Sequence, residues 1–178
     1  MTPSVPWEIR RATGSEALAV AAVHIGSWRV AYRGIMHDDF LDGLDMELRA
    51  SRYKFDLTNP GDPVTFVAVD AAKVVGLVIV GPTRDEDLTG LGEVCALYVE
   101  PDQWRSGVGS ALMKKAEQQL TQDGFTEASL WVLEGNFRGR GFYEATGWRT
   151  DGQTRSIEIG GSQLVEVRYL KELTSRST

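Results

Sequence analysis

A glycine-rich turn that runs directly into a helix is the part of the sequence best suited to chemistry. In the stretch VEPDQWRSGVGSALM (99–113), a strand pattern ends, two glycines follow, and an amphipathic segment begins. Glycine lowers the stability of regular elements unless something must approach the backbone closely. Backbone N–H groups at a helix N-terminus bind anions. The residues predicted to hold an anion are Arg105, Ser106, Gly107, Val108, Gly109 and Ser110.

Three interpretations of this turn compete. A P-loop ends in Gly-Lys-Ser/Thr, whereas Gly109 is followed by Ser110 and Ala111, with no lysine. A dinucleotide-binding turn has a third glycine, where this chain has Leu112, and lies near the start of a βαβ unit. A structural turn needs no ligand at all. The turn alone leaves a phosphate site and a structural turn both open.

Covalent and metal chemistry have little support. Cys95, the only cysteine, could carry an acyl group in a ping-pong scheme, but no recognisable motif pairs it with a histidine. Buried cysteine usually acts as a small hydrophobe. One cysteine makes no intramolecular disulfide and no Cys-based metal motif, and only His24 and His37 remain as imidazole ligands. We therefore expect no metal.

The elements that must position these residues follow from periodicity and turn chemistry. The predicted strands are residues 7–11, 64–70, 73–81, 93–99 and 127–133, with two more around 157–159 and 163–170. The predicted helices are a segment opened by Ser15 and closed before Gly34, residues 108–123 and residues 136–146, with a mixed helical pattern over 37–57. This order predicts one α+β domain over residues 1–178 with a mixed sheet.

Two helices have a clear apolar face. The inward positions of the longer one are Val108, Leu112, Ala116 and Leu120. The expected stripe of the first helix is Leu18, Ala21, Ile25, Trp28 and Tyr32.

Two stretches, GEVCALYVEPDQWRSGVGSALM (92–113) and LWVLEGNFRGRGFYEATGW (130–148), resemble the GNAT superfamily of acyl-CoA-dependent N-acetyltransferases. The resemblance implies the GNAT fold, a central, mostly antiparallel twisted sheet that is flanked by helices and splayed between its fourth and fifth strands. In that family a Q/R-x-x-G-x-G/A turn binds the pyrophosphate of coenzyme A through backbone amides. Here Trp104 replaces the first Gln or Arg, so one polar side chain is lost and the main-chain donors remain.

The resemblance also implies catalytic groups. Histone-modifying members have a strand glutamate fourteen residues before a fixed position of the turn. Glu93 lies fourteen residues before Gly107, which matches that position. Side chains alternate along a strand, so Glu93, Cys95, Leu97 and Val99 would share one face. At roughly 3.3 Å per residue Glu93 would lie about 13 Å from Leu97 and act as a base through water. Tyr143 matches the tyrosine that protonates the departing thiolate.

Further cofactor contacts are implied along the same strand and helix. The backbone N–H of Leu97 would meet the acetyl carbonyl, and the backbone of Val99 would meet the pantetheine arm. Asn136 would cap a helix, bind the pantetheine amide, or do both. Arg138 and Arg140 could reach the 3′-phosphate or remain solvated.

The sequence says least about the pocket that would bind the acceptor amine. The family places it near the first helix, which here offers Trp28, Tyr32 and Arg33, although the two aromatic residues also fit core packing. The leading hypothesis is transfer of an acetyl group from acetyl-CoA to a primary amine, in a small molecule or a peptide, by direct attack in a ternary complex. The alternative is an acyl-CoA-binding module without turnover that senses the cofactor or contacts a partner.

Composition limits the remaining options. The 178 residues are 42% hydrophobic and 25% charged, with a formal net charge of −6, which argues against disorder and against nucleic-acid binding. No apolar run approaches the ~20 residues of a membrane span, and no leader pattern is present. We expect a cytoplasmic protein that binds neither nucleic acid nor membrane, and homodimers are common among GNAT relatives.

Overall fold

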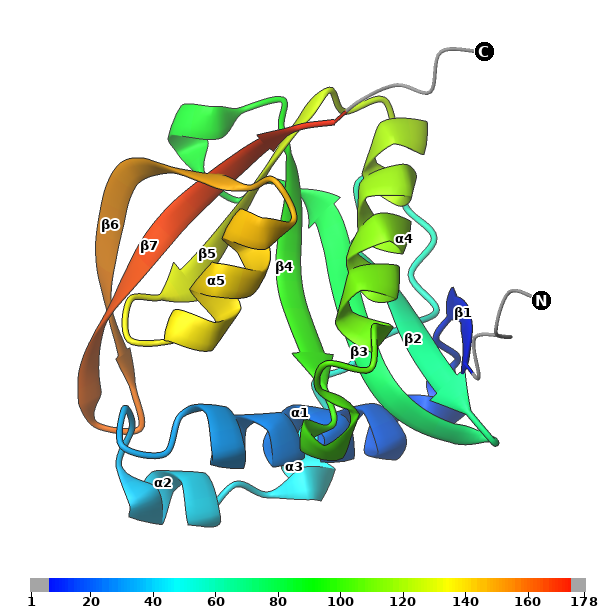
Figure 1. Cartoon of the computed structure of the whole chain (residues 1–178). Coiled ribbons are helices and arrows are strands. Elements are labelled where there is room, and N and C mark those ends of the chain that lie inside the picture. The colour runs from blue at the N-terminus through cyan, green and yellow to red at the C-terminus, as the bar shows by residue number, and fades with distance from the viewer. Residues whose placement is uncertain (1–6, 174–178) are drawn as a thin grey trace.

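The computed structural model describes residues 7–173 as helices on both faces of one sheet (Figure 1). The strands are β1 (Trp7–Arg11), β2 (Val64–Asp70), β3 (Lys73–Pro82), β4 (Gly92–Val99), β5 (Glu127–Leu133), β6 (Arg149–Ile159) and β7 (Ser162–Glu172). The helices are α1 (Ala17–Ala31), α2 (Asp38–Asp42), α3 (Met46–Ala50), α4 (Val108–Gln122) and α5 (Phe137–Ala145). Three short 3₁₀ helices are η1 (Gly14–Glu16), η2 (Glu86–Leu88) and η3 (Pro101–Gln103). The predicted order of elements is confirmed.

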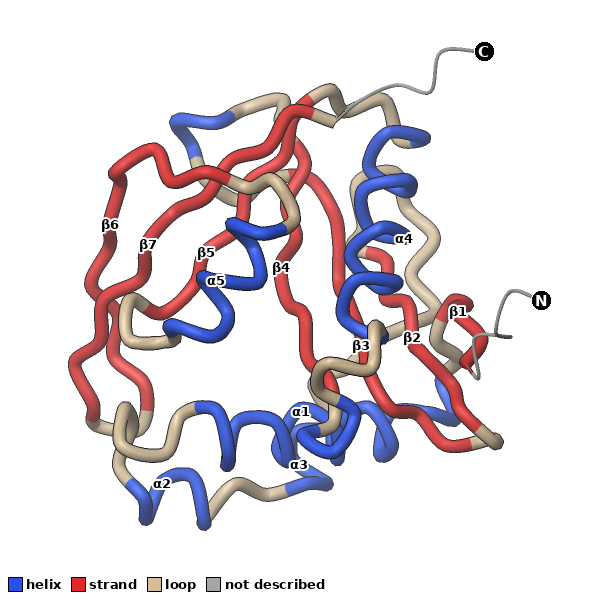
Figure 2. Tube along the Cα trace, in the orientation of Figure 1, coloured by secondary structure: helices blue, strands red, loops and turns tan. Residues whose placement is uncertain are grey.

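The sheet has the order β1-β2-β3-β4-β5-β7-β6, and every neighbouring pair is antiparallel except β4 and β5. The parallel pairing of β4 with β5 covers only Gly92 opposite Ala128 and Glu93 opposite Ser129. Beyond these pairs the two strands separate, as Figures 1 and 2 show. The predicted splay between the fourth and fifth strands is therefore present.

Both faces of the sheet are covered, which explains the near-continuous apolar runs of β2 and β3. On one face, Phe66 and Val78 pack in the main core cluster with Leu112 of α4. On the other face, Val67 and Leu77 pack with residues of α1. Neighbouring residues alternate between the two faces, as the pleat of a strand requires.

The helix predictions are confirmed for α4 and partly wrong for α1. The four inward positions predicted for α4 are buried, each with no exposed area. In α1 the predicted Ala21 and Ile25 are buried, but Leu18 is 54% exposed, and Val20 and Val23 pack on the sheet in its place. Because α1 is apolar around much of its surface, spacing alone could not define its inward face.

A β-bulge in β4 corrects the predicted alternation of that strand. Ile79 of β3 pairs with Ala96, and the next residue, Val80, pairs with Val94, so Cys95 is the extra residue. A bulge reverses the inward and outward positions beyond it. Accordingly Val94 packs in the same core cluster as Leu97 and Val99. Glu93 does not share their face, contrary to the prediction.

The loop between β3 and β4 is held by a buried arginine of β7. Arg168 is 5% exposed and forms ion pairs with Asp87 and Asp151 at 2.8 Å and with Asp85 at 3.5 Å. Asp85 also accepts a hydrogen bond from the indole of Trp131 on β5. Since a buried charge is stable only when it is paired, these contacts fix the loop against β5 and β7.

Candidate active site

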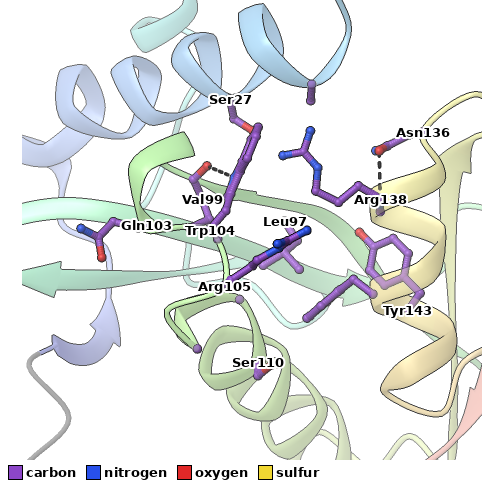
Figure 3. Close-up of a pocket in the computed structure, with 15 residues that line it drawn as sticks. Ser27, Leu97, Val99, Gln103, Trp104, Arg105, Ser110, Asn136, Arg138 and Tyr143 are labelled. Atoms are coloured by element: carbon purple, nitrogen blue, oxygen red, sulfur yellow. Dashed lines mark hydrogen bonds between the residues drawn. The ribbon is translucent and has the colours of Figure 1, made fainter.

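A cavity of about 270 Å³ lies where β4 and β5 separate. Its wall is built by four segments: α1, the end of β4, the turn that leads into the first turn of α4, and α5 with the residue before it (Figure 3). The sequence-predicted residues on this wall are Leu97, Val99, Arg105, Gly107, Gly109, Ser110, Asn136 and Tyr143. Most of the predicted cofactor residues are thus brought together at one place.

The turn before α4 has the backbone of an anion site. Gly107 has φ 100° and Arg105 has φ 66°, both in the left-handed region. Such turns form concave groups of N–H donors. Gly107 is the N-cap of α4, no side chain caps this end, and the first turn holds no acidic residue. The first N–H groups of a helix have no intrahelical acceptor, so they remain available to a ligand.

Two predicted residues of the turn do not lie on the cavity wall. The hydroxyl and the backbone N–H of Ser106 both donate to the carbonyl of Gln103, at 2.6 and 3.3 Å. Val108 is fully buried in the core. The side chains of these two residues stabilise the turn from within, and the backbone N–H of Ser106 is also engaged inside the turn.

The edge of β4 that faces the cavity offers backbone groups. Beyond Glu93, β4 forms no ladder with β5, so this side of the strand has no neighbouring strand to bond. Leu97 and Val99 lie in this segment and line the cavity. The carbonyl of Val99 accepts a hydrogen bond from the indole of Trp104 at 2.9 Å. The arrangement suits a ligand that binds alongside the strand.

Tyr143 and Asn136 enter the cavity from α5. The side chain of Asn136 accepts a hydrogen bond from the N–H of Gly139 at 3.0 Å, so the predicted cap is confirmed. The ring of Tyr143 packs near Phe142, Trp148 and Tyr169. Burial raises the pKa of Tyr143 above its ordinary value. Its hydroxyl is therefore protonated at neutral pH, as a proton donor must be.

The predicted base, Glu93, lies outside the cavity wall. Its side chain is 2% exposed and accepts hydrogen bonds from the backbone N–H of Arg84 at 2.9 Å and from the guanidinium at 2.5 and 3.1 Å. The carboxylate therefore binds the loop between β3 and β4. The predicted role of Glu93 as a base stays a prediction.

Cys95 has the properties of a structural thiol. Burial, and to a smaller extent the charge of Glu93, raise the pKa of Cys95 to about 12. At neutral pH almost none of it is the nucleophilic thiolate. His24 on α1 is engaged elsewhere, with its Nδ1 2.6 Å from the hydroxyl of Tyr53.

The predicted acceptor residues lie at the C-terminal end of α1 and directly after it. Trp28 forms a T-shaped pair with Tyr32, with ring centroids 5.3 Å apart, and Arg33 is exposed and paired with Asp38 and Asp42. Burial raises the pKa of Tyr32, and the neighbouring Asn136 acts in the opposite direction. None of the three predicted residues is on the cavity wall.

Several residues that line the cavity were not predicted from the sequence. Ser27 and Ala31 of α1 reach the cavity in place of their aromatic neighbours, and their four-residue spacing was the available signal. The other additions are Gln103, Trp104, Arg138, Gly139 and Phe142. Among residues 7–173, no group of three or more His, Cys, Asp or Glu side chains gathers to hold a metal. No helix in the same range is long and apolar enough to cross a membrane.

Comparisons with known proteins agree with this geometry. Residues 29–148 match the model of the acetyltransferase (GNAT) family. The chain is 33% identical over 129 residues to the uncharacterized N-acetyltransferase YuaI of Bacillus subtilis, covering 72% of each protein. It is 30% identical over 148 residues to the probable N-acetyltransferase Rv2775 of Mycobacterium tuberculosis, covering 82% of each.

Solved structures share the fold. The PaiA N-acetyltransferase of Thermoplasma acidophilum, crystallised in complex with coenzyme A, superposes with a TM-score of 0.70 at 20% identity. The match covers 93% of this chain and 98% of that one. The family match over most of the chain and the two relatives, together with the shared fold, lead to one conclusion: this chain belongs to the GNAT family of acetyltransferases.

Proposed function

We propose that the protein transfers the acetyl group of acetyl-CoA to a primary amine by direct attack in a ternary complex. The observation that carries the proposal is the cavity between the end of β4 and α5, which brings the uncapped N-terminus of α4 and Tyr143 together on its wall. The amides of the turn would bind the diphosphate, and the pantetheine arm would lie along Leu97 and Val99.

The reaction follows from these positions. The amine nitrogen attacks the carbonyl carbon of the acetyl group, a C–N bond forms, and the C–S bond to coenzyme A breaks. The backbone N–H of Leu97 would donate to the oxyanion as it develops, and a fixed donor of this kind contributes about 3 kcal/mol to an acyl transfer. The thiolate takes a proton from Tyr143, the amine loses its proton to water or, through water, to Glu93, and the Tyr143 phenolate regains a proton from water.

Binding of acetyl-CoA is the first test. Calorimetric titration should show micromolar affinity for acetyl-CoA and much weaker affinity for ATP. Gly107→Asp should abolish binding, because it places a negative side chain at the phosphate site on a backbone with φ 100°. Gly107→Asn is the matched control, since asparagine tolerates positive φ better than most residues and has no charge. Unchanged binding by Gly107→Asp would rule out the turn as the phosphate site.

The role of Tyr143 as the acid is tested by Tyr143→Phe. We expect the turnover number to fall about a hundredfold, because the proton donor is lost, while the Kd for acetyl-CoA changes less than about twofold. Turnover is measured as free thiol released with the best acceptor from a panel of primary amines. A Kd that rises as much as turnover falls would show that the hydroxyl only supports binding.

The order of the reaction is tested by initial rates. Varying acetyl-CoA at several acceptor concentrations should give intersecting lines, as a ternary complex requires, and Cys95→Ala should retain turnover because its thiol is protonated. Parallel lines together with an inactive Cys95→Ala would instead establish an acyl-cysteine intermediate.

The proposed proton acceptor is tested by Glu93→Gln. If the carboxylate is the base, kcat/KM falls about a hundredfold and the acidic limb of its pH profile disappears. If Glu93 only holds Arg84, the pH profile is retained and the free energy of unfolding falls, by about 1–3 kcal/mol, because the buried carboxylate loses its charged hydrogen bonds to the largely exposed Arg84. Urea unfolding and pH–rate profiles of the same samples separate the two results.

A further inference from the structure

Trp104 occupies the cavity wall where related turns carry a polar side chain. Its indole N–H donates to the carbonyl of Val99 at 2.9 Å, which anchors the ring to the end of β4. The rest of the side chain lines the cavity. The ring is therefore fixed on one side and presents its other surface to the ligand space.

Arg138 reaches that ring from the opposite wall. It lies in the first turn of α5, and its guanidinium carbon is 3.4 Å from the centroid of the Trp104 ring. Figure 3 shows the two side chains meeting across the cavity, with Arg105 close by. A guanidinium over the face of tryptophan is attracted by the negative face of the ring. The stack thus holds a cation on the cavity wall and links α5 to the turn.

The charge of Arg138 is unbalanced by protein groups. None of the ion pairs between residues 7 and 173 includes Arg138 or Arg105, although both line the cavity. Both arginines are exposed, and partial desolvation and the nearby charge of Arg105 lower the pKa of Arg138. Two guanidinium groups that converge without a carboxylate favour an anion between them, since planar N–H forks bind phosphate strongly.

We propose that Arg138, positioned by its stack on Trp104, binds the diphosphate of the acyl-CoA from the α5 side, opposite the amides of the turn. This inference rests on the proposed function and deepens it. Arg138 would supply from another element the polar contact that Trp104 cannot make, and Trp104 would be a positioning residue.

Arg140 gives a matched control on the same helix. Its guanidinium donates to the hydroxyl of Tyr169 and to the carbonyl of Glu134, both at 3.1 Å, and it does not line the cavity. Arg138→Gln therefore removes a positive charge inside the site, and Arg140→Gln removes the same charge outside it. Calorimetry with coenzyme A and with dephospho-CoA then measures the effect of each.

For Arg138→Gln we expect about a tenfold weaker affinity for both ligands, the loss typical of one charged hydrogen bond. For Arg140→Gln we expect no change. Equal losses for the two ligands assign the contact to the diphosphate. A loss for coenzyme A alone would overturn that assignment, because dephospho-CoA lacks only the 3′-phosphate.

A double-mutant cycle tests the positioning role of Trp104. Trp104→Leu should weaken binding as much as Arg138→Gln, and the double variant should lose no more than either single one. Trp104→Phe keeps an aromatic face but not the N–H, so it should retain most of the affinity. Additive losses, or a loss in Trp104→Phe equal to that in Trp104→Leu, would show that Trp104 acts only through Val99.

The failures of the two proposals are distinguishable. If the wild-type protein does not bind coenzyme A, the proposed function itself fails. If it binds and Arg138→Gln binds equally well, the proposed function stands and the role of Arg138 is overturned.

Discussion

The interaction on which the site depends is the short parallel pairing between β4 and β5. Two residue pairs hold these strands together, and past Glu93 they part. Backbone polar groups that are buried without partners are costly, so an unpaired strand edge inside a domain needs a ligand or solvent. Here the separation of the strands leaves the cavity that the end of β4, the start of α4 and α5 line. The core below it is continuous, because α4 packs on β2, β3 and β4.

Local irregularities concentrate on the segment from β4 to α4. The bulge at Cys95 turns Leu97 and Val99 toward the cavity side, and the left-handed backbone at Arg105 and Gly107 directs the turn to the same place. A non-glycine residue with positive φ costs free energy that the surrounding structure must offset. Here the offset includes the hydrogen bonds of Ser106 and the anchored ring of Trp104. The irregular backbone conformations are thus found in the segment that we propose binds the ligand.

Sequence reasoning succeeded where local physics decides the outcome. The strand runs, the periodicity of α4 and the glycine turn all follow from spacing and backbone preference, and the structure has them where the patterns predict. The bulge in β4 could not be predicted, because it is determined by the pairing with β3 and not by the sequence of β4 alone. The ion pair between Arg84 and Glu93 could not be predicted either, because it depends on how the loop between β3 and β4 folds back. Arg138 contacts Trp104 only because α5 packs beside β4, so no spacing in the sequence predicts that contact.

The ion cluster of Arg168 joins the two halves of the sheet at one end. Arg168 belongs to β7, whereas Asp85 and Asp87 belong to the loop that leads into β4. The cluster therefore fastens the loop before β4 to β7, near the end where β4 and β5 still pair. At the other end the segment from α1 to α2 bridges the halves, since α1 packs on β2 and β3 while Met36 and Leu41 pack with Leu133 of β5 and Leu164 of β7. The two halves of the sheet are thus joined by ion pairs at one end and by an apolar helical segment at the other, so the gap between β4 and β5 is closed at both ends.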